Sequence, residues 1–311
     1  MTAIRSVALV TNPYSGHGRG LVAAAAATAR FAERGVRVRE IRGADAAETV
    51  RLVRDSLRGP ERPDAVVCAG GDGLVCVTLQ AIASTGVPLG LLPGGTGNDL
   101  ARELGVPDDD PRAAADIVLG GCVRTIDLGA IESTLDPDHA RGPMRFATVA
   151  GTGFDARVTL RANRMRRPKG SLRYSFAAVP ELLGQLGVPY RIELSGEPDE
   201  AGDRVVETEA VMVAVGNTRT YGGGMLICPD AIVDDGLLDL TVVGAMSRLE
   251  MVRLLPALAA GKRIDHPAVG HYRARTITLT AAVPATADGD PAGVLPATFR
   301  AEPGALAILV P

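Results

Sequence analysis

The stretch DAVVCAGGDG at residues 64–73, followed by PLGLLPGGTGNDLAR at residues 88–102, decides the fold of this chain. In each half an apolar run of strand type, Ala65 to Ala69 and Val87 to Leu92, enters a glycine-rich turn. The turns are about 25 residues apart, a separation that suits two parallel strands joined by one helix. Because ligands of open α/β sheets bind at the carboxyl ends of strands, both turns mark a binding edge.

The residue types in the two turns predict a ligand that carries phosphate. Glycines let backbone N–H groups approach a bulky anion, and each turn leads into a helix N-terminus, whose partial positive charge favours phosphate. Asp72 and Asp99 would repel phosphate unless a divalent cation lies between them. One glycine turn after a strand is ordinary turn chemistry. The pair at this spacing favours a magnesium–nucleotide site.

The rest of the chain predicts two domains of different class. Up to about residue 100, strands and helices alternate, which indicates a three-layer α/β domain. From about Asp127 onward strands dominate, which indicates a mostly antiparallel β-sandwich domain. The expected strands there are 123–131, 144–150, 190–194, 205–215, 237–243 and 272–280, with a clear helix at 248–263. The turn NPYSG at residues 12–16 lacks the lysine of a Walker A loop but faces the same sheet edge.

Composition narrows the function classes. A chain of 311 residues with 46% hydrophobic residues suggests two domains with substantial cores. The net charge of −3 gives no global reason to bind nucleic acid. We expect no secretory signal and no membrane span, and therefore a soluble, cytoplasmic protein. The cysteines lack CxxC spacing, so we expect them reduced and without zinc; they are Cys68, Cys76, Cys122 and Cys228.

Taken together, these motifs resemble the diacylglycerol kinase catalytic-domain family of bacterial lipid kinases, to which sphingosine and ceramide kinases are related. The resemblance continues in order along the chain through GTGFD (151–155), YGGGM (221–225), PDA (229–231), DDG (234–236) and DGD (288–290). GGDG alone would also fit NAD kinases and phosphofructokinases. PGGTGND and YGGGM separate the lipid-kinase interpretation from these.

The resemblance implies ATP and Mg²⁺ as cofactors and a diacylglycerol-like lipid as acceptor. It also implies a nucleotide domain over residues 1–127 that is completed by about residues 300–311, a β-sandwich lipid-kinase domain over 128–299, and a nucleotide between them. The implied nucleotide-binding residues are Asn12, Pro13, Ser15, Gly16, Gly70, Gly71, Asp72, Gly73, Gly95, Thr96, Gly97 and Asn98.

The implied catalytic groups are acidic. Asp72, Asp99 and Asp127 would bind the catalytic Mg²⁺, and Asp290 would deprotonate the acceptor hydroxyl, with Asp72 as the second candidate for that base. Relatives carry Asp-Gly-Glu where this chain has DGD, so Asp290 is one methylene shorter. By residue type alone, DGD also fits a hairpin turn. Asp235 would help to hold a second, structural Mg²⁺, although DDG equally fits a simple hairpin.

Two features keep alternatives open. The family pattern GGDGTxxE becomes GGDGLVCV here, which loses a Thr hydroxyl at Leu74 and a Glu at Val77 and is compatible with a non-catalytic nucleotide-binding regulator. Phosphorylation of a sphingoid base, a ceramide or NAD also remains open.

A basic segment bears on the partners. Residues 156–180 carry seven Arg or Lys and no Asp or Glu, so the segment 157–173 is a candidate for transient contact with an anionic membrane or head group, or else a solvated helix surface. We expect no nucleic acid partner, because few aromatic residues accompany these charges. The sequence leaves a homodimer open.

Overall fold

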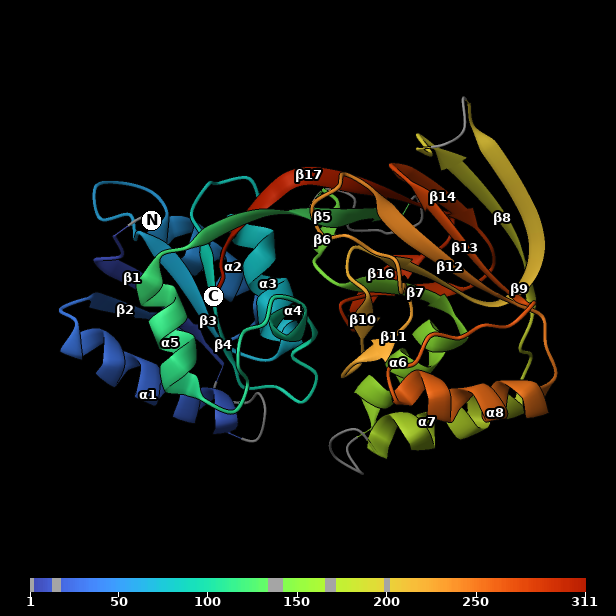
Figure 1. Cartoon of the computed structure of the whole chain (residues 1–311), viewed down its shortest axis with the longest axis horizontal. Helices are drawn as coiled ribbons and strands as arrows, with labels where there is room; N and C mark the ends of the chain where they lie inside the picture. The colour runs from blue at the N-terminus through green and yellow to red at the C-terminus, as the bar shows by residue number, and fades with distance from the viewer. Residues whose placement is uncertain (1–2, 13–17, 134–141, 166–171, 199–201) are drawn as a thin grey trace. The chain divides into compact units, whose positions relative to one another are not determined.

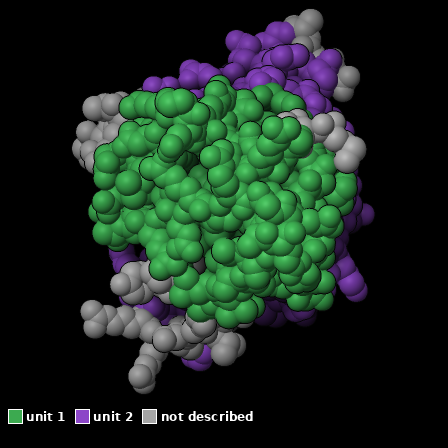
Figure 2. All heavy atoms as spheres, turned by 90° about the vertical axis from the view of Figure 1, so that its left-hand side faces the viewer, with its two compact units in different colours: residues 1–127, 304–311 green, residues 128–303 purple. Residues whose placement is uncertain are grey.

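The computed structural model describes residues 3–12, 18–133, 142–165, 172–198 and 202–311. They form two compact units, unit 1 with residues 1–127 and 304–311 and unit 2 with residues 128–303 (Figure 2). Two strands, β5 (Val123–Ser133) and β17 (Ala297–Leu309), contribute residues to both units. The chain therefore passes from unit 1 to unit 2 along β5 and returns along β17.

Unit 1 is built on a parallel sheet of order β2-β1-β3-β4, to which the last residues of β17 add by pairing Ile308 with Leu89. Every residue of β3 and β4 is buried, as their continuous apolar sequence requires. The two glycine turns thus follow parallel neighbours, as their spacing predicts. The strand bounds are β1 Ser6–Thr11, β2 Arg37–Ile41, β3 Ala65–Gly70 and β4 Leu89–Pro93.

Helices cover both faces of this sheet. Helices α1 and α5 pack together on one face, and α2 and α3 pack together on the other, so unit 1 has the predicted three layers (Figure 1). Side-chain caps begin two of the helices, where Asp45 accepts the amide of Glu48 and Asp110 accepts that of Arg112. The bounds are α1 Arg19–Glu33, α2 Ala46–Ser56, α3 Asp72–Ile82, α4 Asp99–Glu103 and α5 Pro111–Gly120.

Unit 2 is rich in antiparallel strands, which pair in the order β16-β15-β7-β9-β8-β14-β17. Strand β9 is central, because its first half pairs with β8 and its second half pairs with both β7 and β12. The bounds are β6 Met144–Phe146, β7 Val149–Gly153, β8 Val188–Ser195, β9 Arg204–Gly216, β10 Thr220–Tyr221, β11 Met225–Leu226, β12 Leu238–Gly244, β13 Val269–Ala274, β14 Thr276–Thr280, β15 Pro284–Ala287 and β16 Asp290–Val294.

Two apolar clusters hold unit 2 together. One lies among the strands and includes the fully buried rings of Phe146 and Phe299. The other lies beneath three helices, α6 (Phe154–Arg164), α7 (Leu172–Leu183) and α8 (Arg248–Ala259). Within the described ranges, no helix combines the length and the apolar character needed to span a membrane.

Two strands that the sequence predicts as single segments are split, and their predicted bounds were wrong. The run 144–150 divides into β6 and β7 because the backbone amides of Ala147 and Thr148 donate hydrogen bonds to the carboxylate of Asp288. The run 272–280 divides into β13 and β14 at Arg275, where the chain leaves its partner β12 and pairs with β8 and β17. In both places a distant segment decides the break.

Candidate functional site

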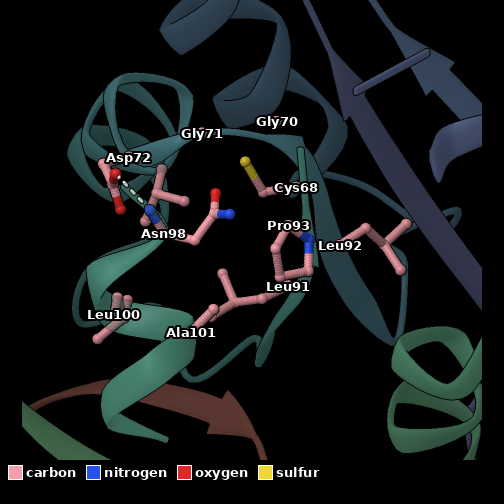
Figure 3. Close-up of a pocket in the computed structure, with 11 residues that line it drawn as sticks. Cys68, Gly70, Gly71, Asp72, Leu91, Leu92, Pro93, Asn98, Leu100 and Ala101 are labelled. Atoms are coloured by element: carbon pink, nitrogen blue, oxygen red, sulfur yellow. Dashed lines mark hydrogen bonds between the residues drawn. The ribbon is translucent and has the colours of Figure 1, made fainter. Parts of the chain in front are cut away.

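Asp72 lies where β3 passes into α3, and its carboxylate holds the second glycine turn. Its Oδ2 accepts a hydrogen bond of 2.8 Å from the backbone amide of Asn98 (Figure 3). Its Oδ1 accepts one of the same length from the backbone amide of Asp99. The Gly94 amide adds a bond of 2.8 Å to the carbonyl of Gly70. One side chain therefore caps α4 and fastens the two turns together.

The glycines of these turns are required by close approach between segments. A Cβ on Gly71 would lie 2.8 Å from the Cα of Gly95. A Cβ on Gly97 would lie 2.5 Å from Oδ2 of Asp72 and 3.2 Å from Oδ2 of Asp99. Both carboxylates therefore converge on a position where the chain has no side chain.

A pocket of about 230 Å³ lies between the two turns, and Figure 3 shows its lining. It has apolar walls and a polar rim formed by Asp72 and Asn98. The side-chain amide of Asn98 braces its own loop, because its Oδ1 accepts the amide of Gly95 at 2.9 Å. The pocket lining is Cys68, Gly70, Gly71, Asp72, Val75, Leu91, Leu92, Pro93, Asn98, Leu100 and Ala101.

The electrostatics of this site favour a bound cation. Burial raises the pKa of Asp72, and the nearby Asp99 carboxylate raises it further, whereas the amides it accepts act against the rise. Asp99 is buried and accepts Nη1 of Arg102 at 2.8 Å. A divalent ion beside both carboxylates would relieve their repulsion, so Asp72 and Asp99 fit Mg²⁺. Among the described residues no three acidic, His or Cys side chains gather into a metal cage, and Mg²⁺ in kinases commonly uses one or two carboxylates plus phosphate oxygens.

The third predicted magnesium ligand, Asp127, is buried at the end of unit 1 along β5. Its Oδ1 accepts the amide of Gly304 at 2.7 Å, which fastens the returning β17. The structure gives this carboxylate a clear structural contact. Its part in binding Mg²⁺ stays a prediction.

The other predicted nucleotide residues are placed unevenly. Asn12 follows β1, whose last residue pairs with Ala69 at the end of β3, so Asn12 belongs to the same sheet edge. Gly73 and Thr96 are exposed at that edge. Pro13, Ser15 and Gly16 lie outside the described residues. Leu74, which replaces the family's Thr, is buried against the core and Val77 is half-buried, so neither adds a polar group to the site.

In unit 2 the motif DGD forms a hairpin. Asp288 and Gly289 are the two tip residues, with φ of 48° and 84°, and Ala287 pairs with Asp290 below them. The carboxylate of Asp288 accepts the amides of Ala147 at 2.8 Å and Thr148 at 2.9 Å, and the hydroxyl of Thr148 at 2.5 Å. The hairpin alternative is confirmed, and Asp288 locks its tip to the β6–β7 junction.

The predicted base, Asp290, begins β16 and is half-buried. Burial raises its pKa, and no described residue forms a hydrogen bond or ion pair with its carboxylate. The amide of Asn163, on α6, donates to the carbonyl of Gly289 at 2.9 Å and holds the hairpin from the other side. The geometry thus presents one unengaged carboxylate on a braced hairpin.

Sequence reasoning did not assign a role to Asp155 and Tyr221, which belong to GTGFD and YGGGM. The structure joins these motifs, because the Tyr221 hydroxyl donates to Asp155 at 2.8 Å. Burial raises the pKa of Asp155 to about 6, although the hydroxyl acts against the rise. Both residues stand in motifs that the sequence singles out, but the sequence does not show that they pair across 66 residues.

The predicted second metal ligand, Asp235, forms an ion pair with Arg273. The same guanidinium lies 3.4 Å from Asp239, whose pKa burial raises to about 6. Arg273 thus supplies the positive charge at this cluster. A second Mg²⁺ bound by Asp235 stays a prediction.

Unit 2 also contains an apolar pocket of about 570 Å³. It lies between α8 and strands β9, β11, β12 and β13, and its polar members are Thr241 and His271, joined by a hydrogen bond of 3.0 Å. The lining is Met212, Leu226, Ile227, Pro229, Thr241, Val243, Met246, Met251, Leu254, Leu255, Leu258, Ile264, Val269 and His271.

Comparison with known proteins identifies both parts of the chain. Residues 6–131 match the diacylglycerol kinase catalytic domain, and residues 148–310 match the YegS C-terminal NAD kinase beta sandwich-like domain. A protein named "Diacylglycerol kinase" from Mycobacterium tuberculosis (strain ATCC 25618 / H37Rv) is 44% identical over 309 residues, 99% of this chain and 96% of the relative.

More distant proteins share the same organisation. A protein of Pseudomonas fluorescens named "Probable lipid kinase YegS-like" is 32% identical over 86% of this chain and 83% of its own length. A crystal structure of a diacylglycerol kinase from Bacillus anthracis str. Sterne matches with a TM-score of 0.71 and 20% identity, over 100% of this chain and 98% of that one. At that identity the structure supports the fold.

Proposed function

We propose, because the chain belongs to the diacylglycerol kinase catalytic-domain family of lipid kinases, that it transfers the γ-phosphate of ATP to the hydroxyl of a diacylglycerol-like lipid in a reaction that requires Mg²⁺. The observation that carries the proposal is the Asp72 clamp. It holds two glycine turns together at the carboxyl edge of a parallel sheet and sets the carboxylates of Asp72 and Asp99 beside the backbone of Gly97.

The turns supply the phosphate site. Phosphoryl transfer needs phosphates held in line and their charge neutralised, with little covalent chemistry from the protein. The exposed backbone at Gly73 and Thr96, and the N-terminus of α3, would hold the phosphates through N–H groups. Asp72 and Asp99 would hold Mg²⁺, which neutralises charge on the β- and γ-phosphates when bound.

Asp290 would act as the base. Its carboxylate takes the proton of the acceptor hydroxyl while the oxygen–phosphorus bond forms and the bond to the departing ADP breaks. Two features support this role: no residue in the described part of the chain bonds to the carboxylate, and burial raises its pKa toward the range in which a base works well. Asp72, the second candidate, already accepts two amides, which makes it the poorer base.

The apolar pocket of unit 2 would receive the hydrophobic part of the lipid. Its walls of Leu, Ile, Val and Met suit an acyl chain, and Thr241 and His271 are the polar members of its lining. NAD has no aliphatic chain for this aliphatic lining, so the pocket favours a lipid over NAD as the acceptor.

The test is transfer of radiolabelled γ-phosphate from ATP, with Mg²⁺, to dispersed diacylglycerol, to sphingosine, to ceramide and to NAD in parallel reactions. We expect labelled phosphatidic acid, and no label on NAD. Label on a sphingoid base or ceramide instead would retain the lipid kinase and replace the acceptor. Tight ATP binding with no labelled product would favour a nucleotide-binding regulator and contradict the proposal.

A further inference from the structure

Exposed apolar side chains concentrate on two helices of unit 2. Of the eleven large hydrophobic residues that are exposed in the described chain, six lie on α7 and α8. On α7, Phe176, Val179 and Leu183 are 60%, 54% and 75% exposed, and their spacing places them on one face. Helix α8 repeats this spacing with Leu249 and Val252, which are 58% and 47% exposed.

The two helices are neighbours that pack on the same core (Figure 1). Ala177 of α7 and Met251 of α8 belong to one buried cluster, so their outer faces point away from that cluster. The guanidinium of Arg248 donates to the carbonyls of Leu182 at 2.7 Å and Gly184 at 2.9 Å, which ties the start of α8 to the end of α7.

We call the outer residues the α7–α8 surface; its members are Phe176, Val179, Leu183, Leu249 and Val252.

Basic side chains accompany this surface. Exposed Arg253 follows Val252 on α8, and exposed Lys262 follows the end of that helix. The acid of α7, Glu181, is neutralised by two arginines of α6, at 3.2 Å and 2.7 Å. Exposed Glu250, in the first turn of α8, offsets one of these charges, so α8 and the residue Lys262 after it keep a small excess of positive charge in a protein of net charge −3.

This arrangement refines the prediction that the basic segment 157–173 contacts a membrane. Two of its arginines, Arg157 and Arg161, are engaged by Glu181. A third, Arg173, stacks on the ring of Tyr174 at 5.0 Å. Exposed Arg164 adds a further positive charge, so the described part of the segment stays basic beside the apolar face of the helices. Arg166, Arg167 and Lys169 lie outside the described residues.

The inner side of α8 adds a second observation. Leu254, Leu255 and Leu258 line the apolar pocket of about 570 Å³. Helix α8 therefore has an exposed apolar side and, on its other side, lines an apolar pocket. A helix of this kind suits the boundary between a bilayer and a lipid-binding cavity.

We infer that the α7–α8 surface docks this protein on an anionic lipid bilayer, with the apolar side chains of both helices inserted among the lipids and Arg253 and Lys262 at the head groups. The inference rests on the proposed function, in which the acceptor is a lipid that resides in the bilayer. Charge complementarity selects an anionic surface over a neutral one. Docking would bring α8 and the pocket behind it to the membrane surface that supplies the acceptor.

The experiment compares the full chain with a Phe176→Ser, Leu183→Ser double variant and with a matched control, Val22→Ser, which changes an equally exposed residue (68%) of unit 1. Cosedimentation uses phosphatidylcholine vesicles with and without about 30% phosphatidylglycerol. This share of anionic lipid keeps the attraction between charges measurable at moderate salt. Activity is measured in parallel on a short-chain diacylglycerol that is soluble without vesicles.

We expect the wild type and Val22→Ser to bind the anionic vesicles, and the double variant to bind them at least tenfold more weakly while it phosphorylates the soluble lipid as the wild type does. Arg253→Gln should lower binding to anionic vesicles alone. Equal vesicle binding by wild type and double variant, or none by either, would overturn the inference. A third outcome would also overturn the inference: the wild type sediments as a dimer, and the double variant loses the dimer but binds vesicles as before. A second copy of the chain would then cover the surface. Loss of vesicle binding with no phosphorylated lipid in any sample would support docking and contradict the kinase proposal.

Discussion

In unit 1 the carboxylate of Asp72 accepts the amides of Asn98 and Asp99, and in unit 2 the carboxylate of Asp288 accepts those of Ala147 and Thr148. Both clamps use one aspartate beside a glycine to hold two consecutive N–H groups of another segment. They differ in reach, because Asp72 bonds to a turn 26 residues away, whereas Asp288 bonds across 140 residues.

The two clamps also position different chemical groups. In unit 1, Asp72 and Asp99 converge beside Gly97, which suits a cation and phosphates. In unit 2, Asp288 holds the hairpin tip so that its neighbour Asp290 presents a carboxylate that no described residue engages. The comparison suggests a division of work, with charge neutralisation in unit 1 and proton acceptance in unit 2.

The largest expected effect comes from breaking the remote clamp. Asp288→Ala removes three hydrogen bonds to a charged acceptor and leaves the amides of Ala147 and Thr148 without a partner, so we expect the free energy of unfolding to fall by about 3–5 kcal/mol. Urea denaturation measures this loss. Asp288→Asn keeps one acceptor oxygen and should lose about half as much. A change within 1 kcal/mol for the Ala variant, roughly the error of extrapolation, would show that the hairpin is held by other contacts.

Adding a side chain at Gly97 in unit 1 should have a smaller effect. The Cβ of Gly97→Ala would meet Asp72 at 2.5 Å, so the carboxylates must move apart and ATP·Mg²⁺ affinity should fall about tenfold, or about 1.4 kcal/mol. Gly120→Ala is the matched control, because no atom lies within 4 Å of its Cβ and its φ is not positive. Calorimetric titration with ATP and Mg²⁺ distinguishes them. Equal affinities would remove Gly97 from the site.

The smallest expected effect is on the pH dependence of stability, and it comes from a third carboxylate, Asp155, which accepts a hydrogen bond from the hydroxyl of Tyr221. Because the folded pKa of Asp155 is raised to about 6, the folded state binds more protons than the unfolded state between its ordinary pKa and that value, so its contribution to stability falls as pH rises through this window. Asp155→Asn removes this cost. We expect its stability advantage over the wild type to grow by on the order of 1 kcal/mol from pH 5 to 6.5. Thermal unfolding across that range would reject this account if the advantage stayed constant.

The two clamps also show what the sequence could predict. The strands and turns of unit 1 were predictable because their residues are uniformly buried and their partners lie within one βαβ unit, so the approach of GGDG to PGGTGND followed from spacing. The split at Ala147 was not, because the Asp288 carboxylate that causes it comes from a distant hairpin. The ion pair of Asp235 with Arg273 is hidden in the same way, 38 residues apart.

The residues of the candidate site also fall into those that the sequence could identify and those that it could not. Residue types in adjacent turns identified Asp72, Asp99 and the glycines, whereas the bracing of Asp290 by Asn163 and the pairing of Asp155 with Tyr221 required the folded chain. Family resemblance singled out Asp290, whose local sequence alone favoured a turn. The structure places it directly after that turn.

The most direct test of the proposed division of work is lipid phosphorylation by Asp290→Asn, measured beside ATP binding by the same variant. A general base contributes about 10²–10⁴-fold, so we predict a loss of kcat in that range with the Kd for ATP·Mg²⁺ unchanged, and substantial activity in Asp290→Glu, which restores the carboxylate. Wild-type kcat in Asp290→Asn would contradict the account and return the role of base to Asp72.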